Sequence, residues 1–304
     1  MWLGFLLICL AGICWIGSGI VVSVCAKRGV SYNIVQLVSC SILVPVSFAI
    51  MYFLDGFRCS LRIYLIVMII CFIGGIGNYF TFLLTEAAMK RGPNGLVWGI
   101  VQSGMIGTFL MGVFMFNEKA SFISWCSLLL TVSGVILSGL KNKKGADVGQ
   151  NPHGFAWLFF SLAGMFFLAI TQCLVGLPSF IEGASEAGSA FRVMTVSMGT
   201  IIAFCIVTLP GLLKRHEFKV TKQTWYISVI TAGIAVLSSI LLFIRGVDLL
   251  AAAGCGGLGY PVAIGISLIG FSVYSLCILR EKLSKIEIIG LAAVTLGIIG
   301  MSLR

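Results

Sequence analysis

The chain has 304 residues, of which 59% are hydrophobic and only 10% are charged, and its mean hydropathy is +1.11. A soluble domain carries about 25% charged residues, so this composition excludes an ordinary soluble protein. It predicts a protein that is embedded in a lipid bilayer. The formal net charge of +10 does not indicate nucleic-acid binding. Its lysines and arginines stand in short gaps between apolar runs instead of forming a basic patch.

Ten long apolar runs follow one another along the chain, separated mostly by short polar gaps. Because about 20 residues of helix cross the hydrocarbon core of a bilayer, every run predicts a transmembrane helix. The first run lacks the basic leader and cleavage site of a removable signal peptide, so we expect it to be retained. The predicted spans are 3–25, 33–54, 63–86, 94–116, 121–140, 155–178, 188–211, 225–247, 252–279 and 284–303.

The eleven cysteines lie mostly inside these apolar runs and never at Cys-x-x-Cys spacing. In lipid a free cysteine behaves as a small apolar side chain. The sequence therefore predicts neither a disulfide framework nor a metal site, and no cofactor is expected.

The two halves of the chain match each other at a nearly constant offset. Five predicted spans lie on either side of a polar stretch, which predicts a first five-helix repeat over 1–140, a connecting loop over 141–153 and a second repeat over 154–304. The matches include Leu10-Ala11-Gly12 with Leu162-Ala163-Gly164, Glu86 with Asp248, Gly95-Leu96 with Gly257-Leu258, Glu118-Lys119 with Glu281-Lys282, and Gly134 with Gly297.

An odd number of spans per repeat has a geometric consequence. Five spans leave the chain on the opposite side of the membrane, so the second repeat is inserted upside down relative to the first. The expected fold is therefore an all-α membrane protein with ten transmembrane helices arranged as two inverted five-helix repeats. Such repeats are a common way to build a transporter with its binding site near the midplane.

Two stretches carry a resemblance to a known family. Thr85 to Leu96 and Phe116 to Ser121, with a second copy from Asp248 through Arg280-Glu281-Lys282 to the C-terminus, resemble the EamA-type half of the drug/metabolite transporter superfamily. Within it, Gly74 to Tyr79 and Gly154 to Pro178 look somewhat like the L-rhamnose–proton symporter branch. The resemblance implies a ten-helix transporter, and the second similarity favours a polar metabolite such as a sugar.

Lysine and arginine are unequally divided between the two sides of the predicted bundle. Gaps 1–2, 3–4, 5–6, 7–8 and 9–10 hold fourteen of the twenty, so the positive-inside rule places them in the cytoplasm. The loop 141–153 is then cytoplasmic and both termini lie outside the cell membrane. Many members of the resembled superfamily are thought to have both termini inside, so charge and resemblance differ on this point.

Four ionisable residues fall within or at the ends of predicted spans: Glu86, Arg192, Arg245 and Asp248. Charged groups in the membrane are costly and usually functional. Arg245 and Asp248 share a helix face and could form a structural pair, and Glu86 could pair with Lys90 one turn later. Alternatively, Glu86, Arg245 and Asp248 couple transport to protons, and Arg192 contacts the substrate.

Uncharged polar and aromatic side chains complete a candidate substrate site. Rings can stack on a sugar or amino acid while amides fix its polar groups. The alternative for each residue is ordinary packing and hydrogen bonding between helices. The candidates for substrate binding, together with Arg192, are Trp15, Asn78, Trp98, Gln102, Gln172, Tyr260 and Tyr274.

The pattern favours a gradient-driven secondary transporter of a small polar metabolite that works by alternating access. No Gly-x-x-x-x-Gly-Lys-Ser/Thr motif for nucleotide binding occurs. An exporter of drugs or metabolites is the alternative, although the first span has no acid to bind a cationic drug. The expected partners are the solute, protons if transport is coupled, and the lipid bilayer, with the chain a monomer or a homodimer.

A membrane-embedded enzyme is a remote alternative, as is a channel or a structural membrane protein. Intramembrane catalysis would require His, Asp or Cys clustered at helical spacing. The two histidines, His153 and His216, both lie in polar gaps, so we expect no enzymatic activity.

Overall fold

The computed structural model describes residues 1–301 apart from 57, 119, 140–154, 217 and 282. It is 86% helix, and no strand occurs in the described part of the chain. The predicted connecting loop 141–153, and with it His153, lies outside the described residues, as do Lys119 and Lys282 of the matched repeat positions.

The helices follow the predicted order of apolar runs. They are α1 (Trp2–Arg28), α2 (Tyr32–Ile50), η1 (Met51–Asp55), α3 (Leu61–Met89), α4 (Asn94–Gln102), α5 (Met105–Met115), α6 (Phe122–Gly139), α7 (Ala156–Gly176), η2 (Leu177–Phe180), η3 (Ala184–Ala187), α8 (Ser189–Val207), α9 (Leu209–Lys214), α10 (Lys222–Ala235), η4 (Val236–Phe243), α11 (Ile244–Ala252), η5 (Gly256–Leu258), α12 (Gly259–Val273), η6 (Tyr274–Ile278) and α13 (Lys285–Met301).

Eight helical segments among the described residues are long and apolar enough to cross a membrane. They correspond to predicted spans one to four and six to nine. The segment α10–η4–α11 is continuous over Lys222–Ala252. Helices α6 and α13 occupy the places of the fifth and tenth predicted spans but are shorter, and α6 contributes the apolar stretch Phe122–Leu137. This architecture fits an all-α membrane protein.

Helix ends coincide with the polar gaps because those gaps contain capping residues. Gly29 ends α1 in the left-handed conformation, with φ of 68°, which glycine adopts without a steric penalty. Ser60 begins α3 by accepting a hydrogen bond from the backbone N–H of Ile63, and Thr221 begins α10 by accepting one from Thr224. These side chains satisfy backbone groups that a helix start leaves open.

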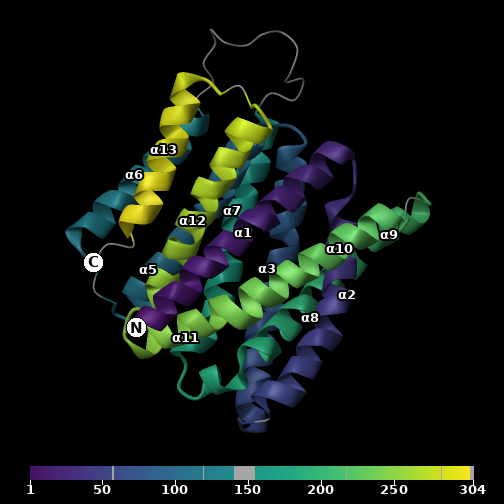
Figure 1. Cartoon of the computed structure of the whole chain (residues 1–304), viewed down its shortest axis with the longest axis vertical. Helices are drawn as coiled ribbons and strands as arrows, with labels where there is room; N and C mark the ends of the chain where they lie inside the picture. The colour runs from purple at the N-terminus through teal and green to yellow at the C-terminus, as the bar shows by residue number, and fades with distance from the viewer. Residues whose placement is uncertain (57, 119, 140–154, 217, 282, 302–304) are drawn as a thin grey trace.

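The helices pack as a bundle in which α3 lies against both α7 and α8, and α1 lies against α12 and the α10–η4–α11 segment (Figure 1). Helix α2 packs between α8 and α10, whereas α6 and α13 form a pair at one side. Many large apolar side chains remain exposed on the outside, among them Trp2, Phe53, Leu61 and Phe122. An apolar exterior of this extent is suited to contact with lipid.

The contact between α3 and α8 depends on two glycines. A Cβ atom on Gly75 would collide with the backbone carbonyl of Val196, and one on Gly199 would collide with that of Phe72. Because lipid supplies no hydrophobic drive for association, membrane helices gain stability from such close backbone approach. The two glycines therefore set the distance between α3 and α8.

Replacement Gly75→Ala is expected to destabilise the protein by about 1–3 kcal/mol, because the added methyl group must displace α8. Thermal unfolding in detergent micelles measures the loss. Gly233→Ala in α10 is the matched control, since a Cβ at that position meets nothing within 4 Å. An unchanged unfolding temperature for Gly75→Ala would contradict the close packing.

Candidate functional site

Among the described residues, Arg192 is the largest side chain that the fold completely buries, with 0% of its surface exposed. It lies in the first turn of α8, and its Nη1 donates to Asp248 Oδ1 and to Ser179 Oγ, both at 3.0 Å. Its Nη2 donates to the backbone carbonyl of Ala184 at 3.3 Å. A charge taken out of solvent persists only with a counter-ion and hydrogen bonds of this kind.

The irregular segments η2 and η3 supply two of these acceptors. Ser179 belongs to η2, which follows the end of α7, and Ala184 begins η3. Arg192 Nε has no hydrogen-bond partner among the described residues. The cluster of Arg192, Ser179, Ala184 and Asp248 therefore joins α8, α11 and the connection between α7 and α8 around one positive charge.

Asp248 forms an ion pair that its helical spacing did not indicate. The ion pair of Asp248 in the structure is with Arg192, 56 residues away in sequence. Arg245 is exposed, and its Nε lies 3.5 Å from Ser189 Oγ at the start of α8. A spacing of three residues identified a common helix face, but it carried no information about the arginine that α8 brings to Asp248.

Three aromatic rings from three different helices meet one another inside the bundle. The ring centroids of Trp15 in α1 and Phe243 in η4 are 4.6 Å apart, as are those of Phe243 and Tyr260 in α12. The Trp15 and Tyr260 centroids are 6.4 Å apart. Gly176 at the end of α7 leaves space for the edge of the Tyr260 ring. The sequence predicted Trp15 and Tyr260 for the site, but no polar signal pointed to Phe243 between them.

Trp98 and Tyr274 belong to a second aromatic group between α4 and α12. Phe271 lies between them, with its centroid 5.4 Å from Trp98 and 5.6 Å from Tyr274. Trp98 is only 2% exposed, and its Nε1 has no partner among the described residues. The structure thus divides the four predicted aromatic residues between two groups.

The three predicted amides have different surroundings. Asn78 Nδ2 donates to Thr200 Oγ1 at 3.4 Å. This hydrogen bond joins α3 to α8, as expected for a residue that serves helix packing. Gln172 in α7 and Gln102 at the end of α4 are both buried. The Oε1 atom of Gln172 lacks a partner within the described structure, so this amide can still bind another group.

Glu86 forms the pair that its spacing indicated. Its Oε1 lies 2.5 Å from Lys90 Nζ, and its own side chain is 3% exposed while that of Lys90 is 42% exposed. The second oxygen, Oε2, is buried with no partner among the described residues. Lys90 therefore reaches the surface while Glu86 remains inside, as expected for a long side chain at a membrane interface.

Two carboxylates bind the starts of helices that are distant in sequence. Glu281, which follows η6, accepts the backbone N–H groups of Asn94 and Gly95 at 2.9 and 3.0 Å, and it accepts Ser275 Oγ at 2.5 Å. Glu118, which follows α5, accepts the N–H of Gly257 at 3.2 Å. A carboxylate at a helix start satisfies open N–H groups and interacts favourably with the helix dipole.

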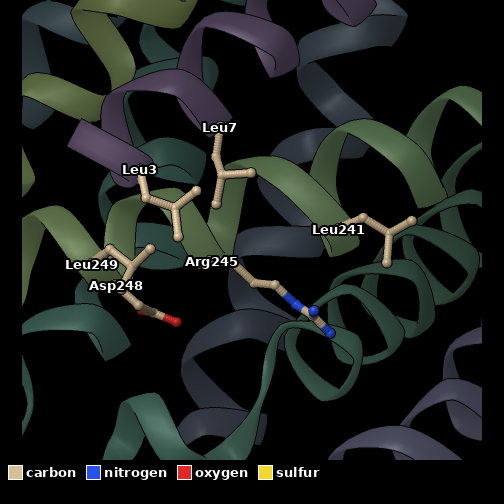
Figure 2. A pocket seen from close by; sticks show the side chains of 6 residues that line it. All are labelled: Leu3, Leu7, Leu241, Arg245, Asp248 and Leu249. Atoms are coloured by element: carbon tan, nitrogen blue, oxygen red, sulfur yellow. The ribbon is translucent and has the colours of Figure 1, made fainter. Parts of the chain in front are cut away.

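A shallow cavity of about 520 Å³, largely open to the outside, lies between α1 and the η4–α11 segment (Figure 2). Leu3 and Leu7 line it from α1, and Leu241, Arg245, Asp248 and Leu249 line it from η4 and α11. Two predicted coupling residues, Arg245 and Asp248, therefore reach this cavity, whereas the predicted substrate-binding residues do not line it.

No known family model and no curated protein matches the chain. A solved structure described only as "Crystal structure of protein" is similar over 99% of this chain and 96% of that chain, with a TM-score of 0.59 and 14% sequence identity. At this identity the likeness establishes a common fold over almost the entire length of both chains.

Replacement Asp248→Ala is expected to destabilise the protein by about 3–5 kcal/mol, because it leaves the buried Arg192 charge without its counter-ion. The double replacement Arg192→Leu with Asp248→Leu removes both charges and should recover most of the loss. Unfolding of Asp248→Leu, Arg192→Leu and the double variant in micelles gives the coupling energy. The exposed Glu182 provides a control, Glu182→Ala, with an expected change below about 0.5 kcal/mol. Strictly additive losses would contradict the ion pair.

Replacement Glu281→Ala should cost about 1–3 kcal/mol, because two backbone N–H groups at the start of α4 lose their acceptor. Glu281→Gln retains one acceptor oxygen and should lose less. Chemical denaturation monitored by circular dichroism ranks the two variants against the parent protein. If Glu281→Ala unfolds at the parent's midpoint, the carboxylate does not stabilise α4.

Proposed function

We propose that this protein is a gradient-driven secondary transporter of a small polar metabolite, a sugar or an amino-acid-like solute, that works by alternating access. In this proposal it consists of ten transmembrane helices in two inverted five-helix halves, 1–140 and 154–304, of the EamA type that its sequence resembles. The charge count places the connecting loop in the cytoplasm and both termini outside.

The observation that carries the proposal is a pair of equivalent contacts between the two halves. Glu281 accepts a hydrogen bond from the backbone N–H of Gly95, and Glu118 accepts one from that of Gly257. Glu118 and Glu281 are equivalent in the sequence repeat, and so are Gly95 and Gly257. The carboxylate of each half accepts a backbone N–H at the start of the equivalent helix of the other half. A two-fold relation between the halves requires such exchanged contacts in pairs.

The helix packing supports the same two-fold relation. Helix α2 packs on its equivalent α8, and α6 packs on its equivalent α13. Helix α3 contacts α7 and α8, while its counterpart α10–η4–α11 contacts α1 and α2. Two similar halves of opposite orientation give inward-open and outward-open states of comparable energy, which is the basis of alternating access.

The interior polar groups support a polar solute as cargo. The rings of Trp15, Phe243 and Tyr260 offer stacking surfaces, and Gln172 has an amide oxygen with no partner among the described residues. Sites that bind small metabolites combine apolar walls with a few fixed polar groups of this kind. Arg192, whose Nε has no partner among the described residues, is the group that we propose for the negative charge of an amino-acid-like solute.

Glu86 and Asp248 are the carboxylates that we propose for proton coupling. They occupy equivalent positions in the two halves, and each pairs with a cation, Lys90 and Arg192 respectively. Protonation of such a carboxylate weakens its ion pair, and intramembrane acids commonly serve proton relays in transporters. The transport cycle would thereby be linked to the proton gradient.

The test is uptake of radiolabelled monosaccharides and amino acids into proteoliposomes, with and without an imposed pH gradient. We expect accumulation of a polar solute that the gradient stimulates, and its loss in Glu86→Gln or Asp248→Asn. Glu182→Gln, which neutralises an exposed carboxylate, is the control and should transport as the parent does. If no polar solute accumulates in either condition while the reconstituted protein remains folded, the proposal is refuted.

A further inference from the structure

Arg245 interrupts an apolar stripe on the outside of the bundle. Leu241, Arg245 and Leu249 are four residues apart and exposed, and they line the same cavity between α1 and α11. Leu3 and Leu7 of α1 form its other wall, as Figure 2 shows. In a bilayer the exposed Leu3, Leu241 and Leu249 contact acyl chains, so the guanidinium of Arg245 lies beside lipid.

Arg245 stands near one end of its apolar helical segment. The segment Lys222–Ala252 has 31 residues, more than the roughly 20 that cross a hydrocarbon core. Arg245 lies within the last two turns before the end of α11 at Ala252. In a bilayer the end of such a long segment emerges among the lipid headgroups.

The charges of the cavity complement a zwitterionic headgroup. Arg245 provides a cationic donor for a phosphate. Asp248 faces the same cavity with a side chain that is 21% exposed, although one of its oxygens binds Arg192. A headgroup that carries both a phosphate and a primary amine can match both side chains, whereas an anionic headgroup would bring its charge towards the Asp248 carboxylate.

We infer that the cavity between α1 and α11 binds one phospholipid of the phosphoethanolamine type. Its phosphate binds Arg245, its amine donates to Asp248, and its acyl chain lies along Leu3, Leu7, Leu241 and Leu249. The bound headgroup reaches Asp248 from the lipid side while Arg192 holds it from the protein interior. This site requires only that the chain is embedded in a membrane, and it is independent of whether the protein transports a solute.

The experiment is native mass spectrometry of the delipidated full-length protein titrated with phosphatidylethanolamine in detergent. We expect saturable binding of one lipid and about a tenfold weaker affinity for Arg245→Gln, which loses a charge-assisted hydrogen bond. Arg245→Lys should retain most of the affinity. Arg62→Gln removes another exposed arginine, at the start of α3, and should bind as the parent does. Equal affinity of Arg245→Gln and the parent would overturn the assignment.

A lipid series on the unaltered protein tests the same site without any variant. Phosphatidylglycerol has no amine, phosphatidylcholine has no N–H donor, diacylglycerol has no phosphate, and free phosphoethanolamine has no acyl chain. All four should bind more weakly than phosphatidylethanolamine. Equal binding of any one of the first three overturns headgroup recognition, and equal binding of phosphoethanolamine shows that the ligand is a free phosphate compound rather than a lipid.

Discussion

A guanidinium without access to solvent must obtain every compensating interaction from the protein, and Arg192 imposes this requirement on the fold. Its Nη atoms bind Asp248 of α11, Ser179 of η2 and the Ala184 carbonyl of η3. Two of these acceptors come from irregular segments. The third comes from a helix that starts more than fifty residues after Arg192 in the sequence. The geometry of the whole connection between α7 and α8 therefore depends on one buried charge.

Two arginines only 53 positions apart in sequence illustrate how depth changes the role of the same side chain. Arg192 is enclosed by protein and balanced by Asp248, whereas Arg245 lies on the outside between exposed leucines. Asp248 connects the two environments, because it binds Arg192 on one side and lines the cavity of Arg245 on the other. A ligand of that cavity would therefore lie beside the carboxylate that pairs with Arg192.

Close packing and backbone capping provide the remaining organisation. The α3–α8 contact relies on Gly75 and Gly199, since a larger residue at either position would strike a backbone carbonyl. The start of α4 is held by Glu281 and that of η5 by Glu118. Backbone groups inside a bilayer need partners within the protein, so these two carboxylates satisfy N–H groups that would otherwise stay open at the starts of these helices.

The sequence by itself determined the helical class and most helix positions, because a run of about 20 apolar residues can be satisfied in lipid only as a helix. It also identified Glu86 with Lys90, since a spacing of four residues places two side chains on one helix face. Such local periodicity extends over a single helix and does not reach beyond it.

Only the tertiary structure decided which distant residues meet. It paired Asp248 with Arg192, placed Phe243 between Trp15 and Tyr260, and separated Trp98 and Tyr274 into another group. These contacts depend on how helices cross and rotate against one another. Helix rotation is set by packing across many residues at once, and no short stretch of sequence carries that information.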